Sequence, residues 1–87
     1  MSEERLARIR ERLQRAFAPS RLELIDDSAQ HRGHAGARGG AGHYRLLIRA
    51  EALRGLSRLE QHRAVYAALA EWIPGEIHAL SIDAGAD

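Results

Sequence analysis

The chain has 87 residues, a formal net charge of +1, five histidines and no cysteine. This length allows one small domain, residues 1–87, and excludes a two-domain enzyme built around a cleft. Without cysteine the chain can be neither a disulfide-stapled scaffold nor a source of thiolate ligands. A net charge near zero gives no bulk attraction to nucleic acid. The five histidines are therefore the feature to explain.

The sequence predicts a cytoplasmic protein with no membrane partner. The first residues, Met-Ser-Glu-Glu-Arg, contain no apolar targeting segment. No apolar run approaches the roughly 18 residues that a membrane-spanning helix needs.

Residues 2–18 predict an amphipathic helix, capped by Ser2 and ended by Pro19. Its apolar side chains recur at helical spacing on one face: Leu6, Ile9, Leu13 and Phe17. All thirteen basic residues of the chain are arginine, and four of them form a second stripe on this helix: Arg5, Arg8, Arg12 and Arg15. We expect this stripe to be a solvated face.

A strand is predicted over residues 21–26, with Leu22 and Leu24 on one side. Residues 28–42 then hold five of the eight glycines and two histidines, with no buried pattern. Loops longer than about 12 residues are uncommon in compact domains and are usually functional or disordered. We therefore expect this flexible loop to be more than a connector.

Alternation resumes over residues 43–49, which predicts a second strand, and a helix follows over residues 57–73. Ser57 and Glu60 form a capping box, and Pro74-Gly75 ends the helix. Its expected apolar face is Leu59, His62, Val65, Tyr66, Leu69, Trp72 and Ile73. The last strand is predicted over residues 77–83, with His78, Leu80 and Ile82 on one face.

The order α-β-β-α-β predicts an α/β fold, a two-layer sandwich in which a three-stranded mixed sheet carries two main helices on one face. The first two strands should be antiparallel neighbours across the loop. The third strand should run parallel to one of them through a right-handed crossover.

We expect no enzyme. The chain has no cysteine, and its serines lie in no nucleophile-elbow context. The loop glycines form no Gly-x-Gly-x-x-Gly fingerprint, and no lysine is present for a P-loop.

The histidines fall into different positions. His62 lies on the apolar face of a predicted helix, where a packed core histidine is the expectation. His43 lies where the loop rejoins the sheet, so it could cap the strand or point back toward a site. His78 begins the last strand, at its rim, while His31 and His34 lie in the loop. Neutral imidazole on a mobile segment near a rim histidine suits iron, zinc, copper or nickel.

Several segments give the chain a resemblance to a known family. They are Asp26-Asp27-Ser28, Gly33-His34-Ala35, His43-Tyr44-Arg45, Gly55-Leu56-Ser57, Gln61-His62-Arg63-Ala64-Val65-Tyr66 and Ile77-His78-Ala79-Leu80-Ser81-Ile82. With these segments in order over most of its length, the chain resembles the BolA family. Its long glycine-rich loop and Trp72 depart from the family pattern.

The resemblance implies a class II KH-like fold and a partnership with a monothiol glutaredoxin. Family members share a [2Fe–2S] cluster with that partner, which also supplies glutathione, in iron–sulfur trafficking or iron homeostasis. The family's last-strand ligand falls on His78, and its variable loop ligand falls on His34, with His31 and His43 as further candidate metal ligands. Because imidazole binds metal only when neutral, we expect the cluster to be lost as pH falls through about 6.

Two other functions remain open. The family also resembles DNA-binding transcriptional regulators of stress response or cell morphology. In that case the helix from Ser57 would be a recognition helix, with Arg58 and Arg63 facing DNA. The near-zero net charge argues against it. A homodimer that hands iron or a cluster onward is the third reading. The sequence does not separate cluster transfer from sensing or storage.

Overall fold

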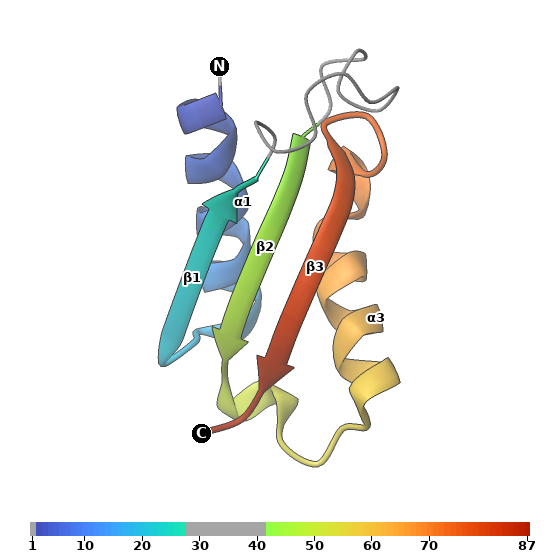
Figure 1. Ribbon diagram of the computed structural model, residues 1–87. Helices are drawn as coiled ribbons and strands as arrows, with labels where there is room; N and C mark the ends of the chain where they lie inside the picture. Colours follow the sequence, from blue (N-terminus) through green and yellow to red (C-terminus); the bar gives the residue numbers. More distant parts are fainter. Residues whose placement is uncertain (1, 28–41) are drawn as a thin grey trace.

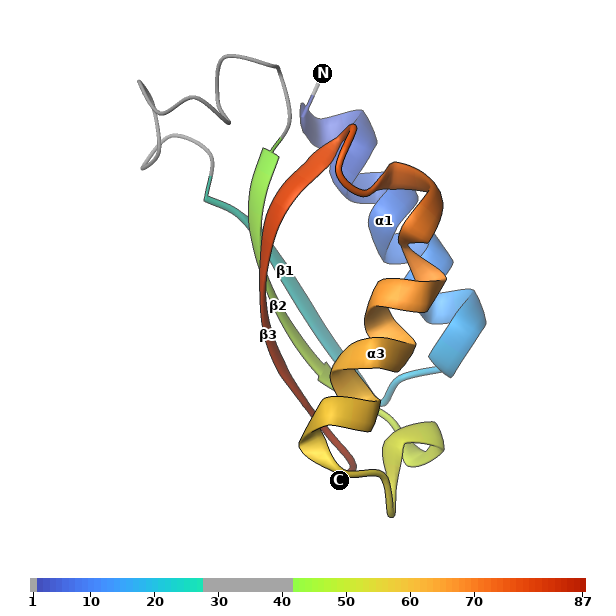
Figure 2. The same ribbon diagram turned by 90° about the vertical axis from the view of Figure 1, so that its right-hand side faces the viewer.

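A computed structural model describes residues 2–27 and 42–87 of the chain. These residues form, in order, α1 (Ser2–Phe17), β1 (Arg21–Asp26), β2 (Gly42–Arg49), the 3-10 turn η2 (Glu51–Leu53), α3 (Arg58–Ala68), the 3-10 turn η3 (Ala70–Trp72) and β3 (Ile77–Gly85). The sheet order is β1-β2-β3, with β1 antiparallel and β3 parallel to β2 (Figure 1). Both helices cover the same face of the sheet (Figure 2). The predicted two-layer fold is confirmed.

The core lies between the sheet and the two helices. Ile9 and Leu13 of α1 are fully buried, and Leu6 and Phe17 pack against them, so the predicted apolar stripe of this helix is confirmed. The strands contribute alternate side chains to the same core: Leu24, Tyr44, Leu46, Ile48 and Ile77. Leu53, in the unpredicted turn η2, is also fully buried.

The second long helix is shorter than predicted. The capping box is present, with the Glu60 amide donating to Ser57 Oγ at 3.1 Å and the Ser57 amide donating to Glu60 Oε1 at 2.8 Å. The α-helix ends at Ala68, however, and the tighter turn η3 follows it. The expectation of one helix to residue 73 is wrong at this end.

The buried face of α3 is also narrower than predicted. Val65 and Leu69 are fully buried, but Leu59 is 58% exposed and Tyr66 is 40% exposed. The helix lies beside and behind β3 at the edge of the sheet (Figure 1), so only a narrow stripe of its surface is covered. His62 is half-buried and lies outside the core, which corrects the expectation of a core histidine.

The arginines of α1 are only in part a solvated stripe, because Arg5 and Arg12 are half-buried. The Arg12 guanidinium lies 4.5 Å from the centre of the Trp72 ring and pairs with Glu71. Arg8 Nη2 lies 2.8 Å from Glu76 Oε1. Because these partners are some 60 residues away in the chain, local periodicity could not identify them. Arg15, which is exposed and 3.8 Å from Glu11 on its own helix, and Arg8, whose side chain is 53% exposed, lie in solvent as expected.

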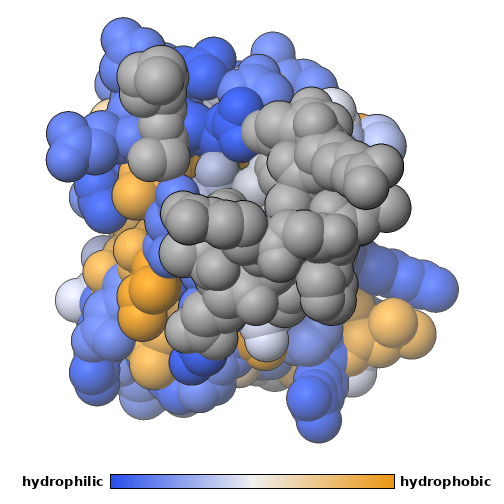
Figure 3. Space-filling view, turned by 45° about the horizontal axis from the view of Figure 1, so that its top comes forward, coloured by the Kyte–Doolittle hydropathy of each residue, from blue (hydrophilic) through white to orange (hydrophobic). Residues whose placement is uncertain are grey.

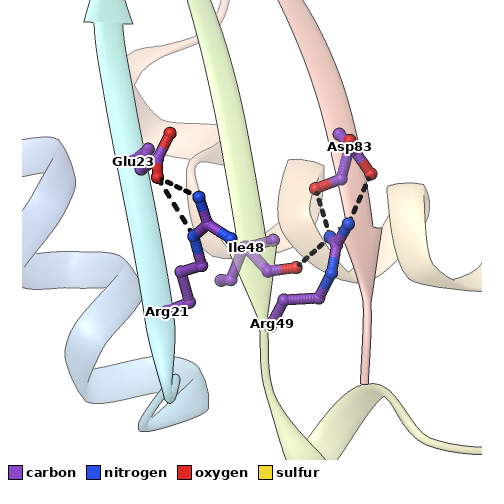
Figure 4. Close-up of polar contacts among 5 residues, drawn as sticks. All are labelled: Arg21, Glu23, Ile48, Arg49 and Asp83. Atoms are coloured by element: carbon purple, nitrogen blue, oxygen red, sulfur yellow. Dashed lines mark hydrogen bonds and ion pairs between the residues drawn. The ribbon is translucent and has the colours of Figure 1, made fainter. Parts of the chain in front are cut away.

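The face of the sheet turned away from the helices carries ion pairs (Figure 4). Arg21 Nη2 lies 2.6 Å from Glu23 Oε2 along β1, and Arg49 Nη2 of β2 lies 3.1 Å from Asp83 Oδ1 of β3. Ile25 of β1 is exposed on the same face. We call the end of the sheet where β1 finishes and β2 and β3 begin the upper end, after its place in Figure 1; the opposite end is the lower end.

Candidate metal centre

At the upper end of the sheet, the pairing of β2 with β3 contains a bulge. Gly42 lies opposite Ile77, but the next residue, His43, lies opposite Ala79. His78 is therefore an extra residue between two pairs. Ile77 and Leu80 both pack into the core. The bulge thus breaks the alternation of β3, and the expectation that His78 shares a face with Leu80 and Ile82 is wrong, because His78 is exposed while Leu80 and Ile82 pack inward. Bulges commonly re-aim a side chain next to a functional site.

Two of the predicted histidines lie close together beside this bulge. The ring centroids of His43 and His78 are 5.1 Å apart, and the two ring planes are tilted by 56°. His43 is only 7% exposed, whereas His78 is open to solvent. The ring of His43 therefore lies beside that of His78, and its role as a metal ligand stays a prediction.

A shallow hollow lies beside His43 on the open face of the sheet. It is lined by residues from the ends of all three strands, including Asp27, His43, Arg45 and Ser81. The Asp27 amide donates to the His43 carbonyl at 2.7 Å, and Arg45 Nε lies 3.1 Å from Asp27 Oδ2. Asp27 is therefore engaged by Arg45, and the imidazoles are the donors of this site best suited to a transition metal.

The segment 28–41 is attached to this same end on both sides, because Asp27 follows β1 and Gly42 begins β2. His31 and His34 belong to that segment and lie outside the described residues. In the view that brings the upper end forward, most of the described surface is hydrophilic, with hydrophobic areas at the sides (Figure 3). Within residues 2–27 and 42–87, no three His, Asp or Glu side chains are grouped to hold a metal ion.

A polar cluster, consisting of Arg5, Gly42, Tyr44 and Glu76, lies at the same end of the sheet, on the side that the helices cover. Arg5 Nη1 donates to the Glu76 carbonyl at 3.1 Å and to Tyr44 Oη at 3.5 Å. The hydrogen bond to Tyr44 is the main reason that the pKa of Arg5 is raised. Burial raises the pKa of the Tyr44 phenol, so the phenol stays neutral at physiological pH.

The sequence did not point to this cluster. The arginine stripe of α1 was visible, but its partners are Trp72 and two glutamates near the end of the chain. The signal that could have indicated these contacts is the presence of two glutamates near the end of a chain whose first helix carries a row of arginines. Only the tertiary fold brings the two parts of the chain together.

The residues expected to contact DNA are placed elsewhere. Arg58 and Arg63 are exposed on α3. Arg58 lines a hollow between α3 and β3 together with His62 and Asp83. Arg58 and Arg63 belong to α3 and do not line the hollow beside His43.

The fold and site define a small α/β domain that presents histidines at one end of a mixed sheet. Residues 13–87 match the family model described as BolA-like protein. The chain belongs to the BolA-like protein family, as the sequence motifs indicated.

Individual relatives agree with this assignment. BolA-like protein 1 of Homo sapiens is 44% identical over 78 residues, which cover 90% of this chain and 55% of the human protein. The DNA-binding transcriptional regulator BolA of Escherichia coli (strain K12) is 35% identical over 75 residues, covering 86% of this chain and 69% of that protein. The solved BolA domain of SufE1 from Arabidopsis thaliana matches with a TM-score of 0.82 at 39% identity, covering 92% of this chain and 88% of that chain.

This chain spans about half the length of the human relative. Within the residues that the structure describes, no helix is both long enough and apolar enough to cross a membrane. The cytoplasmic location stays a prediction.

Proposed function

We propose that this chain is a non-enzymatic partner of a monothiol glutaredoxin and co-ligates a [2Fe–2S] cluster through its histidines, in cluster trafficking or iron homeostasis. One observation carries the proposal. The exposed ring of His78 lies on a bulge, 5.1 Å from the ring of buried His43. This pair lies at the end of the sheet where segment 28–41 begins and ends.

The chemistry of the donors fits such a cluster. Two imidazoles can replace two thiolates on one iron of a [2Fe–2S] cluster, which raises its reduction potential. The chain has no cysteine, so it can supply only the nitrogen half of the ligand set. The thiolates would come from the glutaredoxin cysteine and from glutathione bound by that partner. This division of ligands explains why a histidine site would be built into a cysteine-free chain.

His78 is the first ligand of the proposal because its ring is exposed and displaced from the strand alternation. His34 is the second, since its segment is tied to the same end of the sheet. His31 could replace His34 from the same segment. His43 is the described histidine nearest to His78, and it either binds the metal itself or orients the ring of His78.

The test is co-expression with a monothiol glutaredoxin, followed by absorption and circular dichroism spectra of the purified complex. We expect a coloured heterodimer whose mixed-ligand spectrum disappears with His78→Ala. Separate His34→Ala, His31→Ala and His43→Ala variants then identify the second ligand. His62→Ala is the matched control, because His62 lies on α3 away from the bulge. A His78→Ala complex that is folded and has an unchanged spectrum would exclude the proposal.

DNA binding is the second candidate, favoured by the exposure of Arg58 and Arg63 on α3. A relative in Escherichia coli bears the name of a DNA-binding transcriptional regulator. If the α3 face binds DNA, affinity should fall steeply with added salt and sequence preference should vanish in an Arg58→Ala/Arg63→Ala variant. Arg10→Ala, an exposed change on α1, is the control. Binding that is absent or insensitive to salt would rule out this candidate.

A further inference from the structure

The starts of β2 and β3 are tied together through one carbonyl group. The Glu76 carbonyl accepts the Gly42 amide at 2.8 Å and Arg5 Nη1 at 3.1 Å. Gly42 immediately precedes His43, and Glu76 lies two residues before His78. The same carbonyl therefore fixes the backbone just ahead of both histidines.

An ion pair reinforces this link from α1. Arg5 Nε lies 3.3 Å from Glu76 Oε1, and Arg8 Nη2 lies 2.8 Å from the same oxygen. The Arg5 side chain is only about a quarter exposed, at 24%. Ile9 and Leu13 anchor the same helix in the core. The position of Glu76 is thus coupled to the packing of α1.

The bulge makes this link important for the histidines. Shifting a strand by one residue moves each side chain to the opposite face of the sheet. The register of the β2–β3 pairing shifts by one residue between the pairs Gly42–Ile77 and His43–Ala79, and Glu76 directly precedes Ile77. If this first pair were released, the residues of β3 ahead of Ala79 could move by one position, which would place His78 opposite Gly42 and turn its side chain to the other face of the sheet. His78 would then lose its place beside His43.

We propose that Arg5 and Glu76 are positioning residues that pin the bulge and thereby set the spacing of the His43 and His78 rings. The geometric part of this inference stands on the metal-free protein, and its consequence for cluster binding rests on the proposed function. Arg5 and Glu76 bind no metal in this account. They act through the strand register, which links the histidine pair to the docking of α1.

The test compares two pairs of variants, each of which removes contacts between α1 and the rest of the domain. Arg5→Met removes the side-chain bond to the Glu76 carbonyl, and Glu76→Gln removes the charge that pairs with Arg5 and Arg8, while the Gly42–Glu76 backbone bond remains in both. Arg12→Met and Glu71→Gln are the matched controls, because Arg12 pairs with Glu71, donates to the Ala68 carbonyl at 3.0 Å and stacks on Trp72. These controls remove contacts of α1 with the other helical segments without touching Gly42 or Glu76. A purely structural role would affect both pairs alike.

The first measurement is the nuclear Overhauser effect between the His43 and His78 rings in the metal-free chain. We expect the cross-peak to disappear in Glu76→Gln and Arg5→Met and to remain in both controls. The second is cluster retention by the glutaredoxin complex, which should fall about tenfold in the test variants, as loss of an outer-shell partner does at metal sites. Glu76→Gln keeps the side-chain shape, so it provides the decisive result if Arg5→Met does not fold.

Retention of the cross-peak in folded Glu76→Gln would overturn the inference, and so would an equal loss in Glu71→Gln. Loss of the cross-peak only in the test variants supports the inference. If the cross-peak is lost only in the test variants, but the wild-type complex shows no spectrum of a histidine-ligated cluster, the proposed function is contradicted. The positioning role of Arg5 and Glu76 then still stands. The two failures are therefore distinguishable.

Discussion

Both ends of the sheet carry backbone hydrogen bonds and arginine–carboxylate pairs, but the ion pairs differ in how far they are exposed to solvent. At the lower end, the Ala50 amide donates to the Gly85 carbonyl at 2.9 Å and the Ser20 amide donates to the Arg49 carbonyl at 2.8 Å. Arginine–carboxylate pairs lie at this end too, but they are solvated: the Arg54 and Glu51 side chains are 58% and 76% exposed. At the upper end, Arg5 and Glu76 are 24% and 34% exposed.

The difference shows which ion pair is coupled to the sheet. From His43 opposite Ala79 down to Arg49 opposite Gly85, the β2–β3 ladder is regular. Its lower end therefore contains no irregular step for an ion pair to hold in place. The irregular step lies at the upper end, where Arg5 shares a carbonyl acceptor with Gly42. Exposed pairs contribute little to stability, whereas this one lies where a register change would move the candidate ligands.

The largest expected effect at the upper end is that of Gly42→Ala. A Cβ at this position would overlap the Tyr44 ring, so the ring or the strand must move. We expect the free energy of unfolding, measured with urea, to fall by about 2 kcal/mol, as overpacking does in a close-packed region. Gly75→Ala is the control, because a Cβ at Gly75 meets nothing within 4 Å. Equal stability of the two variants would show that the upper end is loosely packed.

At the lower end, Gly55→Ala tests backbone conformation instead of space. Gly55 has φ of +83°, and an added Cβ would meet nothing within 4 Å, so the substitution strains only the backbone. We expect a loss of about 1 kcal/mol in the same urea experiment. The His43–His78 cross-peak should be unchanged. Its disappearance would mean that the two ends are not independent.

A smaller effect is expected for the ion pair on the open face. Arg49 and Asp83 lie 3.1 Å apart, and the Asp83 side chain is solvent-exposed. A double-mutant cycle with Arg49→Met and Asp83→Asn should give a coupling energy below about 1 kcal/mol that shrinks further in salt. A large, salt-independent coupling would contradict the contrast between the two ends.

The smallest expected effect is on how the free energy of unfolding depends on pH. Hydrogen bonding to Arg54 lowers the pKa of Glu51 in the folded state. A lowered pKa stabilises the fold above the unfolded-state pKa, and this contribution disappears as pH falls through the folded-state pKa. The stability difference between the wild-type chain and Glu51→Gln should therefore be present at neutral pH and vanish in acid. A difference that grows in acid would have the wrong sign for this ion pair.

Local patterns in the sequence were sufficient for the strands, α1 and the capping box, because period and capping chemistry are short-range properties. They were insufficient for α3, since apolar spacing does not reveal which neighbour covers Leu59 or Tyr66. The helix lies over the edge strand, and those two side chains remain exposed.

The candidate site could be predicted only in part, because local patterns identify residues but not the contacts between them. His78 and His43 could be identified from residue type and position at the strand starts. Their proximity depends on the register of the β2–β3 pairing, which has no local sequence signal. The roles of Arg5 and Glu76 depend on a contact across 71 residues.

The most direct test of histidine ligation is pulsed electron paramagnetic resonance of the reduced cluster in the glutaredoxin complex. Only the histidines of this chain would carry nitrogen-15. We expect strong couplings between the cluster and imidazole nitrogens, which change with the isotope and disappear in His78→Ala. A cluster whose spectrum is unaffected by labelled histidine would be ligated by thiolates alone, which would contradict the proposed role of this chain.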